Sequence, residues 1–138
     1  QTKRAIARRV GSTYAYDFLG LLEVGLIQEW DKYISSLSGP DVPSLPTNLF
    51  EAQELLEGAD GELVPGKREI GTNKVGMVAW LVNMKTPEYP MGREVVFIAN
   101  DVTVQSGSFG VPEDEWLLAA WRKQRCRWNP PQVDLLLV

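Results

Sequence analysis

The stretches VGMVAWLVNM (Val75 to Met84) and EVVFIANDVTV (Glu94 to Val104) decide the fold. Both are rich in β-branched and aromatic residues, and both carry apolar side chains at consecutive positions. Strands of this kind bury both of their faces, so each is expected inside a sheet rather than at its edge. The connecting segment, Lys85 to Gly92, contains two prolines and a glycine and predicts a wide turn between neighbouring strands.

The residues that follow predict a loop, a helix and a further strand. Ser106 to Gly110 has the composition of a glycine-rich loop. Pro112 and the three acidic residues after it favour the start of a helix, which should end near Arg127. The apolar run Val133 to Val138 has strand character. This order predicts an α+β fold with an α/β-like β-β-α unit.

A long helix and a hairpin are expected before this unit. Apolar residues at spacings of three and four predict a helix from its cap, Asp17, to about Leu37, with Arg8 to Tyr16 as an extended lead-in. Farther on, an Asp-Gly turn separates two short similar runs, which favours a β-hairpin. The alternative is a short helix over Phe50 to Glu57, because Glu, Ala, Gln and Leu favour helices.

The composition is that of one globular domain and excludes several kinds of chemistry. The chain has 138 residues, of which 44% are hydrophobic and 23% charged. Without histidine there is no Ser-His-Asp or Cys-His catalysis, and the single Cys126 excludes an intrachain disulfide and paired-cysteine zinc sites. One thiol fits a reducing, cytoplasmic location. No apolar stretch approaches the ~18 residues of a membrane helix. Gln1 is not methionine and no signal peptide is visible, so a cut end is expected.

The charge is unevenly distributed along the chain. Residues 1 to 9 carry four basic side chains and no acid, whereas residues 10 to 121 carry 6 basic and 17 acidic side chains. Residues 122 to 138 again have an excess of positive charge, at +3. An acidic body repels a phosphate backbone, so no binding to nucleic acid is expected.

The candidate catalytic element is the loop formed by Gly107, Ser108, Phe109 and Gly110. A phosphate site is disfavoured, because the spacing is not that of a P-loop and the acids of the following helix would repel an anion. Backbone amides of the loop could instead face a carbonyl oxygen that gains negative charge during a reaction. A purely structural turn has the same composition, and the pattern does not decide between them.

Other polar and aromatic residues are weaker candidates. Lys85 and Arg93 flank the wide turn and are candidates for contact with an anionic ligand, although surface placement is favoured. Four carboxylates without a recognisable pairing are expected at the solvated surface: Glu62, Glu69, Glu88 and Asp101. Five tryptophans are expected in the core or at interfaces: Trp30, Trp80, Trp116, Trp121 and Trp128.

Four blocks of sequence carry a resemblance to a known family. They are RVGSTYAYDF (9–18), GTNKVGMVAW (71–80), MKTPEYP (84–90) and ANDVT (99–103) followed by GSFG (107–110). Together they resemble the carboxyltransferase region of eukaryotic multidomain acetyl-CoA carboxylase. The agreement covers roughly residues 8 to 115 in long, ordered blocks.

The resemblance implies that residues 1–138 are a partial carboxyltransferase domain, from the N-terminal half of a crotonase-like fold. Such domains transfer a carboxyl group from carboxybiotin, carried on a separate carrier domain, to acetyl-CoA, giving malonyl-CoA for fatty acid biosynthesis. Backbone amides stabilise the enolate-like species, which would assign an oxyanion role to the loop from Gly107 to Gly110. ATP and a divalent metal belong to the biotin carboxylase part of the parent enzyme. The remainder of the domain and a homodimeric partner would complete the site, so the chain is not expected to turn over substrate alone.

Residues 116–138 do not match the family pattern. The family continues with a helix and strand leading into an Asn-[Ser/Ala]-Gly-Ala-Arg loop, which does not occur here. Divergence, a shifted reading frame and a misjudged splice junction are alternatives, and the abrupt change favours the last two. Val133 to Val138 would then lack neighbours, which predicts marginal stability. A docked helix and a paired last strand would instead favour a second function, a non-catalytic α+β interaction module.

Overall fold

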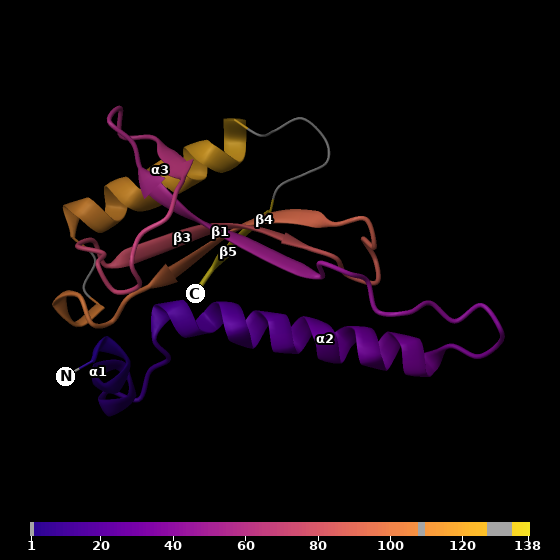
Figure 1. Cartoon of the computed structure of the whole chain (residues 1–138). Helices are drawn as coiled ribbons and strands as arrows, with labels where there is room; N and C mark the ends of the chain where they lie inside the picture. Colours follow the sequence, from indigo (N-terminus) through magenta and orange to yellow (C-terminus); the bar gives the residue numbers. More distant parts are fainter. Residues whose placement is uncertain (1, 108–109, 127–133) are drawn as a thin grey trace.

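The computed structural model describes residues 2–107, 110–126 and 134–138 and has a mixed α+β architecture, as predicted (Figure 1). The elements in chain order are α1 (Lys3–Arg9), η1 (Ala15–Asp17), α2 (Phe18–Ser36), β1 (Phe50–Glu57), β2 (Leu63–Pro65), β3 (Met77–Met84), β4 (Arg93–Asn100), η2 (Gln105–Gly107), α3 (Val111–Cys126) and β5 (Asp134–Leu137). Among the described helices, none has both the length and the apolar character needed to cross a bilayer.

The strands form one sheet in the order β2-β1-β3-β4-β5. The pairs β1–β2, β1–β3 and β3–β4 are antiparallel, whereas β4 and β5 are parallel. A parallel pair needs a crossover connection, which α3 supplies. Strands β3 and β4 lie inside the sheet, which confirms the prediction from their apolar sequences.

The two faces of the sheet are covered by different helices. In Figure 1, α3 lies on one face and α2 runs along the other. Successive residues of a strand point to opposite faces, so β3 sends Ala79 towards Trp116 of α3 and Trp80 towards Phe18 of α2. Trp80 also stacks on Phe97 of β4, with their ring centroids 5.5 Å apart. Burial on both faces explains why these strands are apolar at consecutive positions.

The N-terminal region differs from the prediction. Lys3–Arg9 forms α1, and Ala15–Asp17 is a 3-10 turn, so the extended lead-in expected for residues 8–16 is wrong at both of its ends. The side chain of Asp17 makes no capping hydrogen bond. Its carboxylate accepts a hydrogen bond from Arg4 Nε at 2.8 Å. The ion pair with Arg4 therefore takes the place of the predicted helix cap, and α1 is held against the start of α2.

The hairpin prediction is confirmed, and the alternative of a short helix is wrong. Phe50–Glu57 is strand β1, which pairs with β2 on one side and β3 on the other. Within the turn, the Gly58 amide donates to the Glu62 carbonyl at 2.7 Å. Gly61 has a φ of +78°, a conformation that glycine adopts without strain.

The last strand of the chain is paired, contrary to expectation. Strand β5 pairs with β4, and the pairing is extended by the Val138 amide, which donates to the Ile98 carbonyl at 2.9 Å. The expectation that the last strand would lack neighbours is therefore wrong, because β5 lies along the edge of β4 and pairs with it. Strand β4 ends at Asn100 rather than at residue 104. The expected helix end at Arg127 and the start of the last strand at Val133 lie outside the described residues.

Candidate functional site

The glycine-rich loop lies at the end of the sheet where β4 finishes and before α3 begins. Gly107 adopts a φ of +78° in the short helix η2. Its amide donates to the carbonyl of Val104 at 3.0 Å, and its own carbonyl accepts from Asn100 Nδ2 at 3.1 Å. The Gly107 amide is thus used within the chain.

Gly110, at the other end of the loop, is also hydrogen-bonded within the chain. Its amide donates to Glu113 Oε2 at 3.0 Å. The two remaining residues of the predicted element, Ser108 and Phe109, lie outside the described residues. The amides of Gly107 and Gly110, the two described residues of the element, therefore both donate within the chain.

Glu113 is buried rather than solvated, with only 2% of its surface exposed. Its Oε1 accepts a hydrogen bond from the Gly76 amide at 3.0 Å, in addition to the bond from Gly110. The bond from Gly76 contributes most to lowering the pKa of the Glu113 carboxyl below its usual value. The sequence indicated that Glu113 would repel an anion at the helix end. Instead, its charge is taken up by two backbone amides, while Asp114 and Glu115 are exposed.

Asp101 is a second buried carboxylate, directly after β4. It is fully buried, so the expected place at the solvated surface is wrong. Its oxygens accept from Thr103 Oγ1 at 2.6 Å, Asn73 Nδ2 at 2.8 Å and Lys3 Nζ at 3.4 Å. Burial alone would raise the pKa of Asp101, but the bonds from Thr103 and Asn73 and the charge of Lys3 lower it. Asn73 lies 28 residues and Lys3 98 residues from Asp101 in the sequence, so no local pattern marks these two partners.

The candidates Lys85 and Arg93 lie at the opposite end of β3 and β4. Lys85 Nζ donates to the Thr47 carbonyl at 2.7 Å, and the Arg93 guanidinium lies 4.9 Å from the ring centroid of Tyr89. An eight-residue strand separates the two ends of the sheet by about 23 Å. The structure therefore does not bring these side chains together with the glycine-rich loop.

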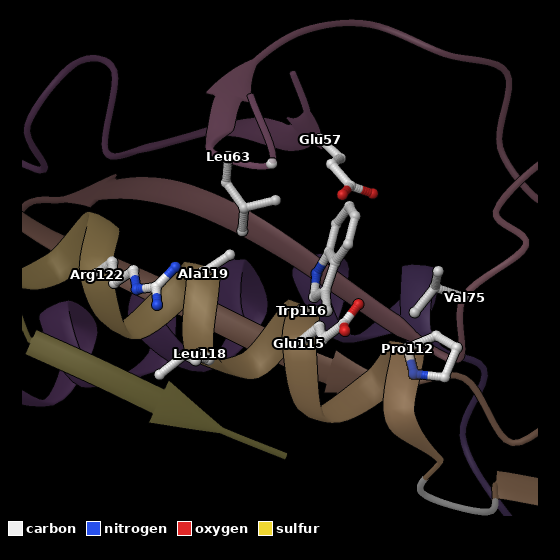
Figure 2. A pocket seen from close by; sticks show the side chains of 10 residues that line it. Glu57, Leu63, Val75, Pro112, Glu115, Trp116, Leu118, Ala119 and Arg122 are labelled. Atoms are coloured by element: carbon white, nitrogen blue, oxygen red, sulfur yellow. The ribbon is translucent and has the colours of Figure 1, made fainter. Parts of the chain in front are cut away.

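A hollow of about 380 Å³ lies between the β1–β2 hairpin and α3 (Figure 2). Figure 2 shows the Trp116 ring between the carboxylates of Glu57 and Glu115, with Leu63 and Ala119 beside it. Trp116 is 6% exposed, and its indole nitrogen has no hydrogen-bond partner among the described residues. The sequence placed Trp116 in the core but gave no sign of this hollow, because hairpin and helix are distant in the chain.

The other tryptophans were also predicted to lie in the core or at interfaces. Trp30 and Trp80 are buried, as expected for core residues, whereas Trp121 is half exposed on α3. Trp128 lies outside the described residues. The Trp30 indole nitrogen donates to the Lys85 carbonyl at 2.6 Å, so this residue fixes the turn end of the sheet.

The chain has clear relatives among characterised proteins. It is 41% identical over 130 residues to acetyl-CoA carboxylase of Schizosaccharomyces pombe and, over the same length, 41% identical to that of Saccharomyces cerevisiae. Each alignment covers 94% of this chain. This chain is a homologue of one segment of eukaryotic acetyl-CoA carboxylase. Acetyl-CoA carboxylase 2 of Arabidopsis thaliana is 43% identical over 122 residues, 85% of the chain. No family model matches.

The match confirms the family resemblance and shows its extent. The chain spans about 6% of the length of the two fungal acetyl-CoA carboxylases. Because those alignments cover 94% of the chain, they continue past residue 115 into the C-terminal segment, where the family pattern was not recognised. The homologous region therefore includes α3 as well as strands β1 to β4.

Proposed function

We propose that this chain forms part of the carboxyltransferase component of acetyl-CoA carboxylase, which carboxylates acetyl-CoA to malonyl-CoA. The observation that carries the proposal is the 41% identity to acetyl-CoA carboxylases across 94% of the chain. The site is consistent with it in one respect: a glycine-containing loop is held at the end of a buried strand, next to a helix start. Chemistry of this kind can rely on backbone amides and needs no histidine.

In the proposed site, the amides of Ser108 and Phe109 donate to the thioester oxygen of acetyl-CoA. Gly107 and Gly110, the described residues of this loop, already use their amides within the chain. When the acetyl methyl group loses a proton, negative charge develops on the thioester oxygen, and donors fixed in advance stabilise it. Lys85 and Arg93 contribute only long-range attraction to an anionic ligand.

The proposed partners follow from the parent reaction. Carboxybiotin is a substrate, delivered by a separate carrier domain, and ATP and a divalent metal serve the biotin carboxylase part of the enzyme. The remainder of the carboxyltransferase domain, in a homodimer, supplies the other wall of the site, and the enzyme acts in the cytoplasm. The crotonase-like arrangement is part of this proposal. On this basis the chain alone binds acetyl-CoA without turning it over.

The test is isothermal titration of the folded chain with acetyl-CoA, comparing Ser108→Pro with Ser108→Ala. Proline removes the amide N–H, whereas alanine removes only the hydroxyl and keeps the amide. Loss of one hydrogen bond, about 1 kcal/mol, should weaken binding about fivefold in Ser108→Pro and leave Ser108→Ala unchanged. Absence of saturable binding by the folded wild-type chain would refute the carboxyltransferase proposal.

A second candidate function is a non-catalytic α+β interaction module. The docked helix α3 and the pairing of β5 with β4 favour it, because they complete a sheet that an isolated piece would leave open. The same titration distinguishes the two functions. A chain that unfolds cooperatively but does not bind acetyl-CoA would support the module, whereas a chain that binds would support the carboxyltransferase.

A further inference from the structure

The hollow between the β1–β2 hairpin and α3 is lined by charged groups that the proposed reaction does not use. Glu57 comes from the end of β1, whereas Glu115 and Arg122 lie two turns apart on α3. All three side chains are exposed, and none forms an ion pair with another described residue. A hollow of about 380 Å³ is within the size range of ligand pockets in proteins. These charges are therefore available to a ligand.

Trp116 brings an unused hydrogen-bond donor to the same hollow. The residue is 6% exposed, and its indole N–H has no acceptor among the described residues. A buried indole N–H normally has a partner, so an unpaired one needs an explanation. In Figure 2 the nitrogen lies on the edge of the ring turned towards Ala119, away from the carboxylates of Glu57 and Glu115. Neither carboxylate accepts its bond, and a group that enters the hollow can supply the acceptor.

The two carboxylates favour a cation as the other part of the ligand. Glu57 and Glu115 lie on either side of the Trp116 ring (Figure 2). A guanidinium group suits this arrangement, because its planar fork donates to carboxylates and packs well against an aromatic ring. The apolar walls, Leu63 and Ala119, suit the methylene stem of an arginine side chain. The carboxylates, the ring and the apolar walls are thus complementary to an arginine.

Arg122 does not oppose this assignment. In Figure 2 its guanidinium lies on the far side of Ala119 from Trp116, whereas the two carboxylates flank the ring. The lining therefore has an acidic part for a cation and a separate part with two donors, Arg122 and the Trp116 N–H, for a carbonyl oxygen. A peptide segment carries both groups, since every residue has a backbone carbonyl.

We propose that this hollow binds an arginine side chain of a partner protein. The guanidinium lies between Glu57 and Glu115, and a backbone carbonyl of the partner accepts the hydrogen bond from Trp116 Nε1. Residues 10 to 121 carry 6 basic and 17 acidic side chains, so the body of the chain attracts a basic partner at longer range. The proposal is independent of the proposed function, because it involves neither acetyl-CoA nor the glycine-rich loop.

The test is an NMR titration of the folded chain with the blocked peptide acetyl-Gly-Arg-Gly-amide. The matched probe has citrulline in place of arginine, which keeps the shape but replaces the guanidinium by a neutral urea group. We expect the arginine peptide to bind at least tenfold more tightly than the citrulline peptide, and a lysine peptide to bind more weakly than the arginine peptide. The indole N–H signal of Trp116, identified by its loss in Trp116→Phe, should shift as the arginine peptide saturates the site.

Variants of the two carboxylates locate the binding. Glu57→Gln and Glu115→Gln should each weaken binding of the arginine peptide at least fivefold. The controls are Glu51→Gln on the same strand and Asp114→Asn on the same helix, which remove one charge each from exposed positions that do not line the hollow. Both controls should change the affinity less than twofold. All four positions are exposed, so the variants are expected to fold.

Four results would overturn the proposal in whole or in part. Absence of saturable binding would leave water as the only occupant of the hollow. Equal binding of the citrulline peptide would show that the cation is not recognised, and equal weakening in the controls would show general attraction to an acidic surface. Any of these three results refutes the arginine site. Binding that depends on Glu57 and Glu115 but leaves the Trp116 indole signal unchanged refutes the role of its N–H. No acetyl-CoA is present, so the outcome does not depend on the carboxyltransferase proposal.

Discussion

The two ends of strands β3 and β4 use charge in opposite ways. At the turn end, Lys85 and Arg93 keep their charged groups near the surface, against a carbonyl and an aromatic ring. At the loop end, the carboxylates of Asp101 and Glu113 are buried and surrounded by donors. The turn end therefore keeps its charged groups near the surface, whereas the loop end holds its charged groups in buried hydrogen bonds.

This difference bears on where a ligand can be recognised. Exposed cations act at long range and are screened by salt, so they attract anions but do not fix their geometry. A loop held at both ends by buried charges can present backbone donors in a fixed arrangement. Under the proposed function, the ligand is therefore expected at the loop end rather than at the turn end, even though the side chains of the loop end are acidic.

Acid should destabilise the loop end of the sheet, and we expect this to be the largest change in the free energy of unfolding. Both Asp101 and Glu113 have a lowered pKa in the folded chain, so each contributes stability that is fully present above its unfolded pKa, near 4. That contribution is lost as the pH falls through the lowered pKa of the folded state. Urea denaturation should give a constant free energy of unfolding between pH 7 and 5, with a steep decrease below about pH 4.

The double variant Asp101→Asn, Glu113→Gln is the control for this pH series. It lacks both titrating groups and should lose much less stability below pH 4 than the wild-type chain does. A variant with the same acid profile as the wild-type chain would show that other carboxylates cause the decrease, Asp17 in its exposed pair with Arg4 being the first to consider.

The turn end should respond to the loss of Trp30, with a smaller effect. Trp30 is 3% exposed, and its indole N–H donates to the Lys85 carbonyl at 2.6 Å. Trp30→Phe removes that bond and part of the packing, which should lower the free energy of unfolding by about 2 kcal/mol. Trp121→Phe, at a half-exposed position, is the control and should change it by less than about 0.5 kcal/mol. Equal effects in the two variants would contradict the anchoring role of Trp30.

Much of the fold could be predicted from local patterns. The consecutive apolar residues of Val75 to Met84 identify a central strand, and the spacing in Phe18–Ser36 identifies a helix. Helix α1 was missed, because KRAIARR is short and its apolar residues show no clear period. It is held in place partly by Lys3, whose partners Asn73 and Asp101 are far away in sequence.

The loop before α3 could be predicted from the sequence, but the buried hydrogen bonds at its ends could not. Glycine and a following helix start marked the loop, because both are local signals. The burial of Asp101 and Glu113 depends on donors from Asn73 and Gly76, which only the folded chain brings near. An acidic residue without a recognisable partner is usually solvated, and that general tendency gave the wrong prediction for Asp101.

Replacing Lys85 should have the smallest effect, and the result decides whether the two ends of the sheet differ in function. The ammonium group of Lys85 bonds the Thr47 carbonyl at an exposed position, so Lys85→Ala should change the free energy of unfolding by about 0.5 kcal/mol or less. If its charge only attracts acetyl-CoA at long range, affinity should fall no more than about twofold at low salt, and the difference should vanish at high salt. Lys67→Ala, which removes the same charge from another exposed position, should have the same small effects on stability and on acetyl-CoA affinity. A tenfold loss that persists at high salt and is specific to Lys85 would indicate direct contact, and it would move the ligand site from the glycine-rich loop to the turn.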